Sequence, residues 1–288
     1  MFLLLMIWGS SVYSQQDLKN LLDDLSDITG IDFVLPRTTF KSTRIMNGHS
    51  VEKMAPGDLD FRVSHRFGRL NSGAYEFFGL DQANTHLSLE YGITKWLMAG
   101  IGRGTYEKTF DGFAKFTLAR QSQGTKSFPL SVSLLSTMTY RTVKPGAGAE
   151  DYTFSERSAF TGQLLVARRL DQNLSLQLMP TVISRDVAGT EPALLWAAGV
   201  GGRVNLAKRI SLNAEYYYSF DRGTYLNSEV YNPLSIGFDI EAGGHVFQLI
   251  FTNSVAMIEK GFIGETTGSW GKGDIHFGFN ISRVFGIR

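Results

Sequence analysis

Three polar residues at alternate positions, His86, Ser88 and Glu90, have types and a spacing that could support catalysis. Residues two apart on a β-strand share one face, so a histidine could act as the base for a serine nucleophile. If this strand crosses a membrane, the alternating apolar residues between Leu87 and Tyr91 face lipid. The histidine and serine then point away from a lipid substrate. No neighbouring motif supplies an orienting asparagine. We therefore predict a non-enzymatic role for these side chains as polar lumen residues, with a lipid hydrolase as the remote alternative.

A second candidate site is acidic. Asp239 and Glu241 would share a strand face, with His245 just beyond the following turn. Carboxylates with a histidine can bind a metal, but an acidic pair in a polar interior more often pairs with arginine. The chain has no cysteine, which excludes disulfides and thiolate metal sites. We predict no metal site and no cofactor.

These residues lie in segments where apolar and polar side chains alternate strictly, as from Ile210 to Phe220. A period of two indicates a β-strand with one apolar and one polar face. Most segments are long enough to cross a bilayer as tilted strands, which takes about 9–11 residues. The predicted strands are 58–67, 84–91, 96–104, 112–120, 130–140, 158–169, 174–185, 194–206, 209–221, 233–241, 245–252 and 274–285.

The links between these strands alternate between long and short along the chain, which is typical of transmembrane barrels with short periplasmic turns and longer external loops. We therefore predict an all-β fold: a transmembrane antiparallel β-barrel of about twelve strands, in the bacterial outer membrane. An even number of strands places both termini in the periplasm. The competing architecture is a soluble β-sandwich or calyx.

The alternation also assigns side chains to the lumen. Charges of both signs inside a barrel could line a path for small polar solutes, or could pair and fill a closed barrel that acts through its loops. A twelve-stranded barrel lies between the filled eight-stranded and the open 16–18-stranded sizes, so both hypotheses stay open. Six glycines predicted to point inward leave room for water or for a plug: Gly100, Gly102, Gly199, Gly201, Gly237 and Gly278. The predicted lumen-lining residues are Asp60, Arg62, Arg66, His86, Glu90, Lys115, Arg203, Glu215, Asp239, Glu241 and His276.

The N-terminal part divides into two pieces before the barrel at 57–288. Residues 1–8 are apolar and 9–14 small or polar, a pattern that predicts a signal peptide over 1–14. Residues 15–56 are then a periplasmic leader. Within it, the basic stretch 38–51 could enter the lumen as a plug, or remain a tether or an extra strand at the rim. As a plug, it would pair with the nearby acids and histidine of the first, second and last strands: Asp60, Glu90, Asp274 and His276.

The composition limits the classes of molecule that the protein could bind. The formal net charge is +1 with no basic cluster, which argues against nucleic-acid binding. We expect contacts with outer-membrane lipid, with a small polar solute, and with the barrel-insertion machinery through the C-terminal strand, which carries Phe285 near its end. External stretches such as 74–78 mix aromatic and acidic residues, which suits sugar or protein contacts as well as ordinary loop packing.

Three stretches carry a resemblance: TFKSTRIMNGHSVE at 39–52, LDFRVSHRFGRLNSGAYEFFGLDQ at 59–82, and YGITKWLMAGIG at 91–102. Over about 38–288 the chain resembles a family of outer-membrane β-barrel proteins from Bacteroidota that is known only as a domain of unknown function. The resemblance implies a Gram-negative outer-membrane setting. It implies no activity and no functional residues.

Overall fold

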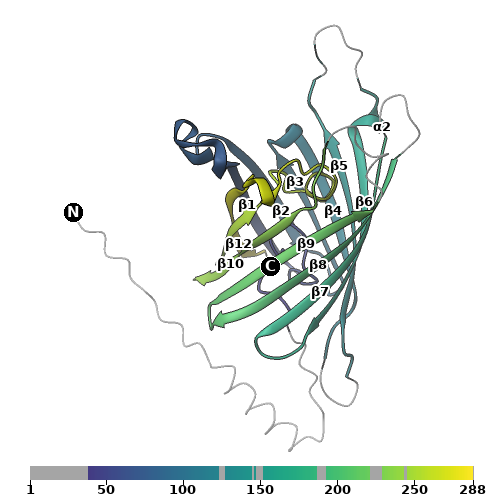
Figure 1. Ribbon diagram of the computed structural model, residues 1–288. Coiled ribbons are helices and arrows are strands. Elements are labelled where there is room, and N and C mark those ends of the chain that lie inside the picture. The colour runs from purple at the N-terminus through teal and green to yellow at the C-terminus, as the bar shows by residue number, and fades with distance from the viewer. Residues whose placement is uncertain are drawn as a thin grey trace, which may run out of the picture.

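The computed structural model describes residues 38–122, 127–144, 146, 152–186, 193–220, 229–242 and 245–287. The signal peptide predicted over 1–14 and most of the leader lie outside these residues. Twelve antiparallel strands form one closed barrel in which each strand pairs with its sequence neighbours and β1 pairs with β12 (Figure 1). The predicted twelve-stranded barrel is confirmed, because every strand finds two partners and no free sheet edge remains among the described strands.

The observed strand ends differ from the predicted ones by at most three residues. The largest difference is in the fourth strand, which begins at Thr109 rather than at the predicted Gly112. The strands are β1 (Asp58–Arg69), β2 (Ala83–Gly92), β3 (Leu97–Gly104), β4 (Thr109–Ala119), β5 (Ser131–Arg141), β6 (Ser158–Arg169), β7 (Leu174–Arg185), β8 (Ala193–Ala207), β9 (Ile210–Phe220), β10 (Leu234–Ala242), β11 (His245–Thr252) and β12 (His276–Gly286).

Alternation along each strand separates two faces of the wall. On β9, Asn213 is 1% exposed whereas Tyr218 is 50% exposed, although both belong to one continuous strand. Apolar side chains such as Leu134 and Leu176 occupy the outward face. The polar side chains are therefore buried inside the barrel, and the exposed apolar surface is the face that meets lipid.

The long connections lie at one end of the barrel, which also carries all the short helices of the described residues (Figure 1). Turns at the other end are short except for the β4–β5 connection, 120–130, and the β3–β4 connection at the helix end, 105–108, is itself short. No helix in the described part of the chain is long and apolar enough to cross a membrane. The helices are η1 (Leu70–Ser72), η2 (Ala74–Gly79), η3 (Tyr106–Lys108), α2 (Phe154–Arg157), α3 (Glu259–Gly264) and η4 (Trp270–Lys272).

Two segments that are not strands fill the interior. Residues 38–54, here called the lumen segment, precede β1 and contain fully buried side chains such as Ile45 and Met46. Residues 253–266, here called the inner loop, connect β11 to β12 and bury all of α3. The hydrophobic core combines both segments with inward side chains of the wall, including Leu135, Leu165 and Met179. The barrel is thus a packed body rather than an empty tube.

Candidate functional site in the barrel lumen

The lumen segment turns back on itself inside the barrel. Ile45 N–H donates to the carbonyl of Gly48 at 2.8 Å, and Ser50 N–H donates to the carbonyl of Thr43 at 2.9 Å. Arg44 and His49 form an antiparallel bridge between the two arms. This tight hairpin satisfies only part of its own backbone, so the remaining buried amides and carbonyls need partners from the wall.

Charged groups at the start of the hairpin form a network with β1 and β2. The guanidinium of Arg44 lies 2.8 Å from the carboxylate of Glu90. Arg62 lies 2.9 Å from Asp60 and 3.6 Å from Glu90. The Thr43 hydroxyl donates to Glu90 at 3.0 Å and accepts from Arg62 at 2.7 Å. Asp60 and Glu90 are fully buried, so each carboxylate depends on these cations.

Lys115 of β4 binds the hairpin through backbone carbonyls. Its Nζ donates to the carbonyls of Thr43 at 3.4 Å, Ser50 at 3.0 Å and Glu52 at 2.7 Å. Lys115 is itself fully buried. One wall cation therefore holds both arms of the hairpin together.

Glu215 of β9 binds the tip of the hairpin. Its carboxylate accepts backbone N–H groups of Asn47 at 2.7 Å and Gly48 at 3.1 Å. On β7, Gln177 accepts from Val51 N–H at 2.7 Å and donates to the carbonyl of His49 at 2.8 Å. These wall side chains supply the backbone partners that a strand would ordinarily provide.

Further contacts come from the strands that close the barrel. Gln248 donates to the carbonyl of Ile45 at 3.0 Å, and Asn280 to that of Met46 at 2.9 Å. Arg66 donates to the side-chain oxygen of Asn47 at 2.7 Å. The hairpin is therefore surrounded by contacts from β1, β2, β4, β7, β9, β11 and β12.

Two of the inward glycines make room for the apolar side chains of the hairpin. A Cβ added to Gly201 would lie 2.5 Å from Cδ1 of Ile45, and one added to Gly237 would lie 2.6 Å from Sδ of Met46. Both distances are far shorter than a van der Waals contact. The lumen segment occupies the space beside Gly201, and it shares the space beside Gly237 with the backbone carbonyl of Leu249.

The inner loop enters from the end with the long connections. Phe262 of α3 packs edge-on against Tyr217 of β9, with ring centroids 5.3 Å apart. Lys260 lies 2.6 Å from Glu107 and 2.8 Å from Glu265, and Arg185 lies 2.7 Å from Glu265. These ion pairs hold the loop against the wall near η3 and the end of β7.

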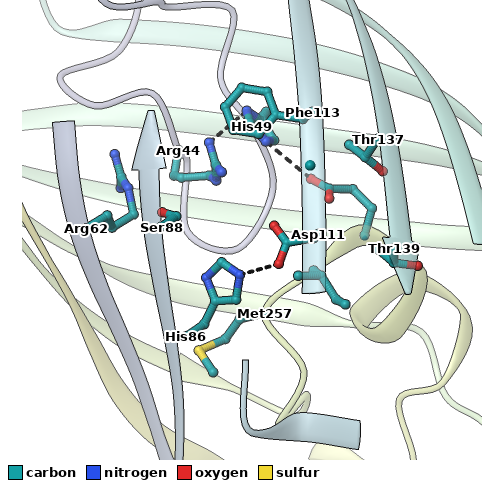
Figure 2. A pocket seen from close by; sticks show the side chains of 13 residues that line it. Arg44, His49, Arg62, His86, Ser88, Asp111, Phe113, Thr137, Thr139 and Met257 are labelled. Atoms are coloured by element: carbon teal, nitrogen blue, oxygen red, sulfur yellow. Dashed lines mark hydrogen bonds and ion pairs between the residues drawn. The ribbon is translucent and has the colours of Figure 1, made fainter. Parts of the chain in front are cut away.

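The lumen segment and the inner loop meet at a small cavity of about 20 Å³, enough for one water molecule (Figure 2). His49 Nε2 lies 3.8 Å from Glu259 Oε1 of the inner loop. Burial and the neighbouring Arg44 hold the pKa of His49 well below its usual range. The ring is therefore neutral, and its Nδ1 accepts a hydrogen bond from Arg44 at 2.7 Å. Burial raises the pKa of Glu259 to about 7, although Arg44 opposes that shift.

Two of the three residues that first indicated chemistry, His86 and Ser88, line this same cavity. His86 Nε2 donates to Asp111 Oδ1 at 2.6 Å (Figure 2). Ser88 also lines the cavity, and its buried hydroxyl has no hydrogen-bond partner. A histidine oriented by an aspartate is one element of a hydrolase site, but the cavity leaves no space for an acyl substrate.

The other predicted lumen residues lie at various heights in the barrel. Asp239 accepts from Gln248 at 2.8 Å inside the wall, whereas Glu241 is 40% exposed at the rim and lies 3.2 Å from Lys41. The acidic pair thus has separate partners. Arg203 is buried on β8. Among the described residues, no group of three histidine, aspartate or glutamate side chains could hold a metal.

The prediction that Asp274 and His276 pair with the lumen segment is wrong. Asp274 lies 3.3 Å from Arg69, and His276 bonds the carbonyl of Phe67 at 2.8 Å. Both lie where β12 begins, at the end with the long connections. The lumen segment approaches from the opposite end, beside the start of β1, so these groups are out of its reach.

Sequence reasoning missed two parts of this site. The rule that long links are external loops predicts the link 253–273 outside the barrel, whereas the inner loop fills the lumen. The available signal was the apolar stretch Val255–Ile258, followed closely by Phe262 and Ile263, which is unusual for a solvated loop. Sequence reasoning also missed Gln177 and Gln248, whose amides bind the hairpin backbone, because neutral polar residues are ordinary on an inward face.

Several solved barrels have a similar fold. They include the NanC porin (TM-score 0.48, 7% identity, covering 78% of this chain and 98% of that one) and the KdgM porin (0.46, 8%, 79% and 99%). An outer membrane channel from Pseudomonas putida F1 aligns at a TM-score of 0.45 with 10% identity, covering 81% of this chain and 97% of that one. No curated protein sequence matches the chain.

A family model described as "Membrane bound beta barrel domain (DUF5777)" matches residues 40–285. The match spans the barrel and nearly all of the lumen segment. Closed antiparallel barrels with an apolar outer face cross the bacterial outer membrane. The chain belongs to this family of membrane-bound β-barrel domains, and its place is the outer membrane.

Proposed function

We propose that the protein is an outer-membrane channel for small polar solutes, and that the lumen segment closes it. The observation that carries the proposal is the way in which this segment is bound. Side chains of seven strands bind the segment by hydrogen bonds and ion pairs, and those of β4, β7, β9, β11 and β12 bind its backbone. The chain joins the segment to the barrel only at β1. A separate piece that fills a polar tube can leave it and expose a polar path.

The energetics of the wall support this interpretation. Departure of the lumen segment exposes apolar side chains such as Ile45 and Met46 to water, which opposes opening. The contacts of Lys115, Glu215 and Gln177 are polar, however, so water can replace each of them when the segment leaves. Buried ion pairs such as Arg44 with Glu90 contribute little net stability, because desolvation offsets much of their attraction. The closed state can therefore exchange with a hydrated one.

Planar-bilayer conductance tests the proposal. The full mature chain is compared with a chain that starts at Ala55, which lacks the lumen segment. We expect larger or more frequent openings from the shorter chain. Heat-modifiable migration on gels shows whether each barrel is folded. A folded shorter chain that never conducts would contradict the channel and favour a closed structural barrel acting through its loops.

A full-length variant provides a second test that keeps the segment in place. Lys115→Met removes all three bonds to hairpin carbonyls while retaining a long side chain. We expect more frequent openings than in the parent protein. Lys208→Met is the matched control, because Lys208 lies in the turn after β8 and its side chain has no part in the lumen contacts described above.

We further propose that the protein is not an enzyme. The size of the cavity at Ser88 supports this, since about 20 Å³ leaves no room for an acyl substrate beside the serine in the closed barrel. Export by a signal peptide over 1–14, insertion by the barrel-assembly machinery through β12, and a Bacteroidota source are also proposals. They rest on the sequence pattern, on Phe285 near the C-terminus and on the resemblance of 39–52, 59–82 and 91–102.

A further inference from the structure

The connection between β1 and β2 exposes an unusual set of large rings. The side chain of Tyr75 is 95% exposed, that of Phe77 59% and that of Phe78 52%. The only charged residue between Leu70 and Leu80 is Glu76. An ordinary solvated loop carries small polar residues, so this loop has the composition of a contact surface.

The backbone holds these rings outward in a fixed conformation. Phe77 has φ 45° and ψ 47°, and Phe78 has φ 54° and ψ 38°, both in the left-handed region. Phe78 N–H donates to the carbonyl of Gly73 at 2.9 Å, and Leu80 N–H to that of Phe77 at 3.1 Å. Bulky residues in this region cost about 1–3 kcal/mol each. The backbone of the loop is therefore strained at Phe77 and Phe78, and the strained conformation leaves both rings exposed.

The base of the loop is fixed at the rim. Leu70 N–H donates to the carbonyl of Ile275 at 2.8 Å, and Asn71 donates to Asp274 at 2.9 Å. These bonds join the loop to the start of β12. In Figure 1 the loop, in dark blue, lies to one side of the barrel end, away from α2.

Outward-facing aromatic residues continue from the loop down the wall. Phe67 of β1 stacks on Phe277 of β12 with centroids 5.8 Å apart, and Phe277 contacts Phe251 of β11 at 5.4 Å. These rings belong to the lipid-facing surface. The loop therefore extends an established lipid contact beyond the end of the strands.

We propose that the loop at 70–80 is a membrane anchor, with Tyr75, Phe77 and Phe78 seated in the headgroup region of the outer leaflet. Aromatic rings are stable at this depth because one edge can stay hydrated while the ring body leaves water. Continuity with the lipid-facing rings of β1 and β12 favours lipid over a protein partner. The anchor would fix the depth and tilt of the barrel on the β1–β2 side.

The absence of cysteine from the chain makes a direct test available. Single variants Tyr75→Cys, Phe77→Cys and Phe78→Cys of the full chain are spin-labelled and placed in phosphatidylcholine nanodiscs. Collision rates with oxygen, which concentrates in lipid, are compared with those of a water-soluble nickel chelate. Ser155→Cys is the control, because Ser155 is exposed in α2 on the β5–β6 connection.

We expect an oxygen-to-chelate ratio several-fold higher at the three loop sites than at position 155. A ratio equal to that of position 155 would overturn the proposal and leave a solvated loop. Protection from both reagents would also overturn it, since it would indicate burial against another protein or a second copy of this chain. Heat-modifiable migration confirms that each labelled barrel is folded, and three independent sites guard against failure of one variant.

Discussion

Arg44 and Glu90 form an ion pair of 2.8 Å that joins a segment outside the strand order to the second strand of the barrel. The Glu90 side chain is fully buried, and Arg62 of β1 approaches the same carboxylate at 3.6 Å. The Glu90 carboxylate therefore pairs with two cations, one from the wall and one from the lumen segment. Loss of its charge should weaken the binding of the lumen segment more than the stability of the strands.

We predict that Glu90→Gln increases the frequency of channel openings in planar bilayers. Removal of one partner of a buried ion pair costs about 3–5 kcal/mol, because the remaining charge stays desolvated. Arg44 can escape that cost by leaving the lumen, whereas Arg62 still has Asp60. Glu241→Gln is the matched control, since the pair of Glu241 with Lys41 is partly exposed and worth about 0–1 kcal/mol. Equal opening frequencies in the two variants would contradict the assignment.

A second prediction uses the contact between Gly201 and Ile45. Gly201→Ala places a Cβ 2.5 Å from Ile45 Cδ1, while its next nearest neighbour, Met179 Cε, is 3.4 Å away. Overpacking of this kind costs about 1–3 kcal/mol, which the lumen segment can relieve by moving out. We expect more frequent openings from Gly201→Ala.

The companion change Ile45→Ala distinguishes this contact from a general defect. By itself it leaves a cavity and should also loosen the segment. In the double variant the new methyl group occupies part of the vacated space, so the two effects should be less than additive in a double-mutant cycle. Additive effects on opening frequency would show that Ile45 does not lie against Gly201.

The lipid-facing surface predicts a dependence on depth along one strand. Val200 and Leu206 both point outward on β8 and are 45% and 57% exposed, but Val200 lies mid-strand and Leu206 beside the short turn to β9. Val200→Arg should lower the free energy of unfolding by about 2–4 kcal/mol, and Leu206→Arg by about 0–1 kcal/mol. Denaturant unfolding in lipid vesicles measures both. Equal losses would mean that this face does not cross the bilayer as described.

Closure by the inner loop should depend on pH through Glu259. Burial raises the pKa of this carboxyl to about 7 in the docked loop, against an ordinary value of 4.5. The docked loop therefore holds its proton more tightly than the undocked one. Docking is strongest at acidic pH, weakens as the pH rises from 4.5 through 7, and changes no further above that range.

Tryptic cleavage after Lys260 reports undocking, because that side chain is buried only while the loop is docked. We expect cleavage of the folded barrel to accelerate between pH 6 and pH 8 beyond the change in trypsin activity, which a flexible reference peptide calibrates. Glu259→Gln should abolish the additional acceleration, since the amide does not titrate. Persistence of the effect in that variant would assign it to another group.

The sequence alone determined the wall of this barrel. Strict alternation, as from Ile210 to Phe220, identifies a strand and both of its faces, because successive side chains point to opposite sides of any strand. Short links such as 170–173 then predict that neighbouring strands pair, which the closed barrel confirms. The same rule placed Glu90, Lys115 and Glu215 on the inner face before their partners were known.

Only the tertiary structure decided what occupies the lumen. The lumen segment and the inner loop have no regular period, so no sequence rule fixes where their side chains point. Their positions depend on contacts between residues far apart in the chain, such as Arg44 with Glu90 and Gly201 with Ile45. Asp274 shows the consequence: it is acidic and close in strand order, but it lies at the other end of the barrel. Strand order predicts which residues are neighbours around the wall. The height of a residue along the barrel axis, and the packing of segments without a regular period, are known only from the closed fold.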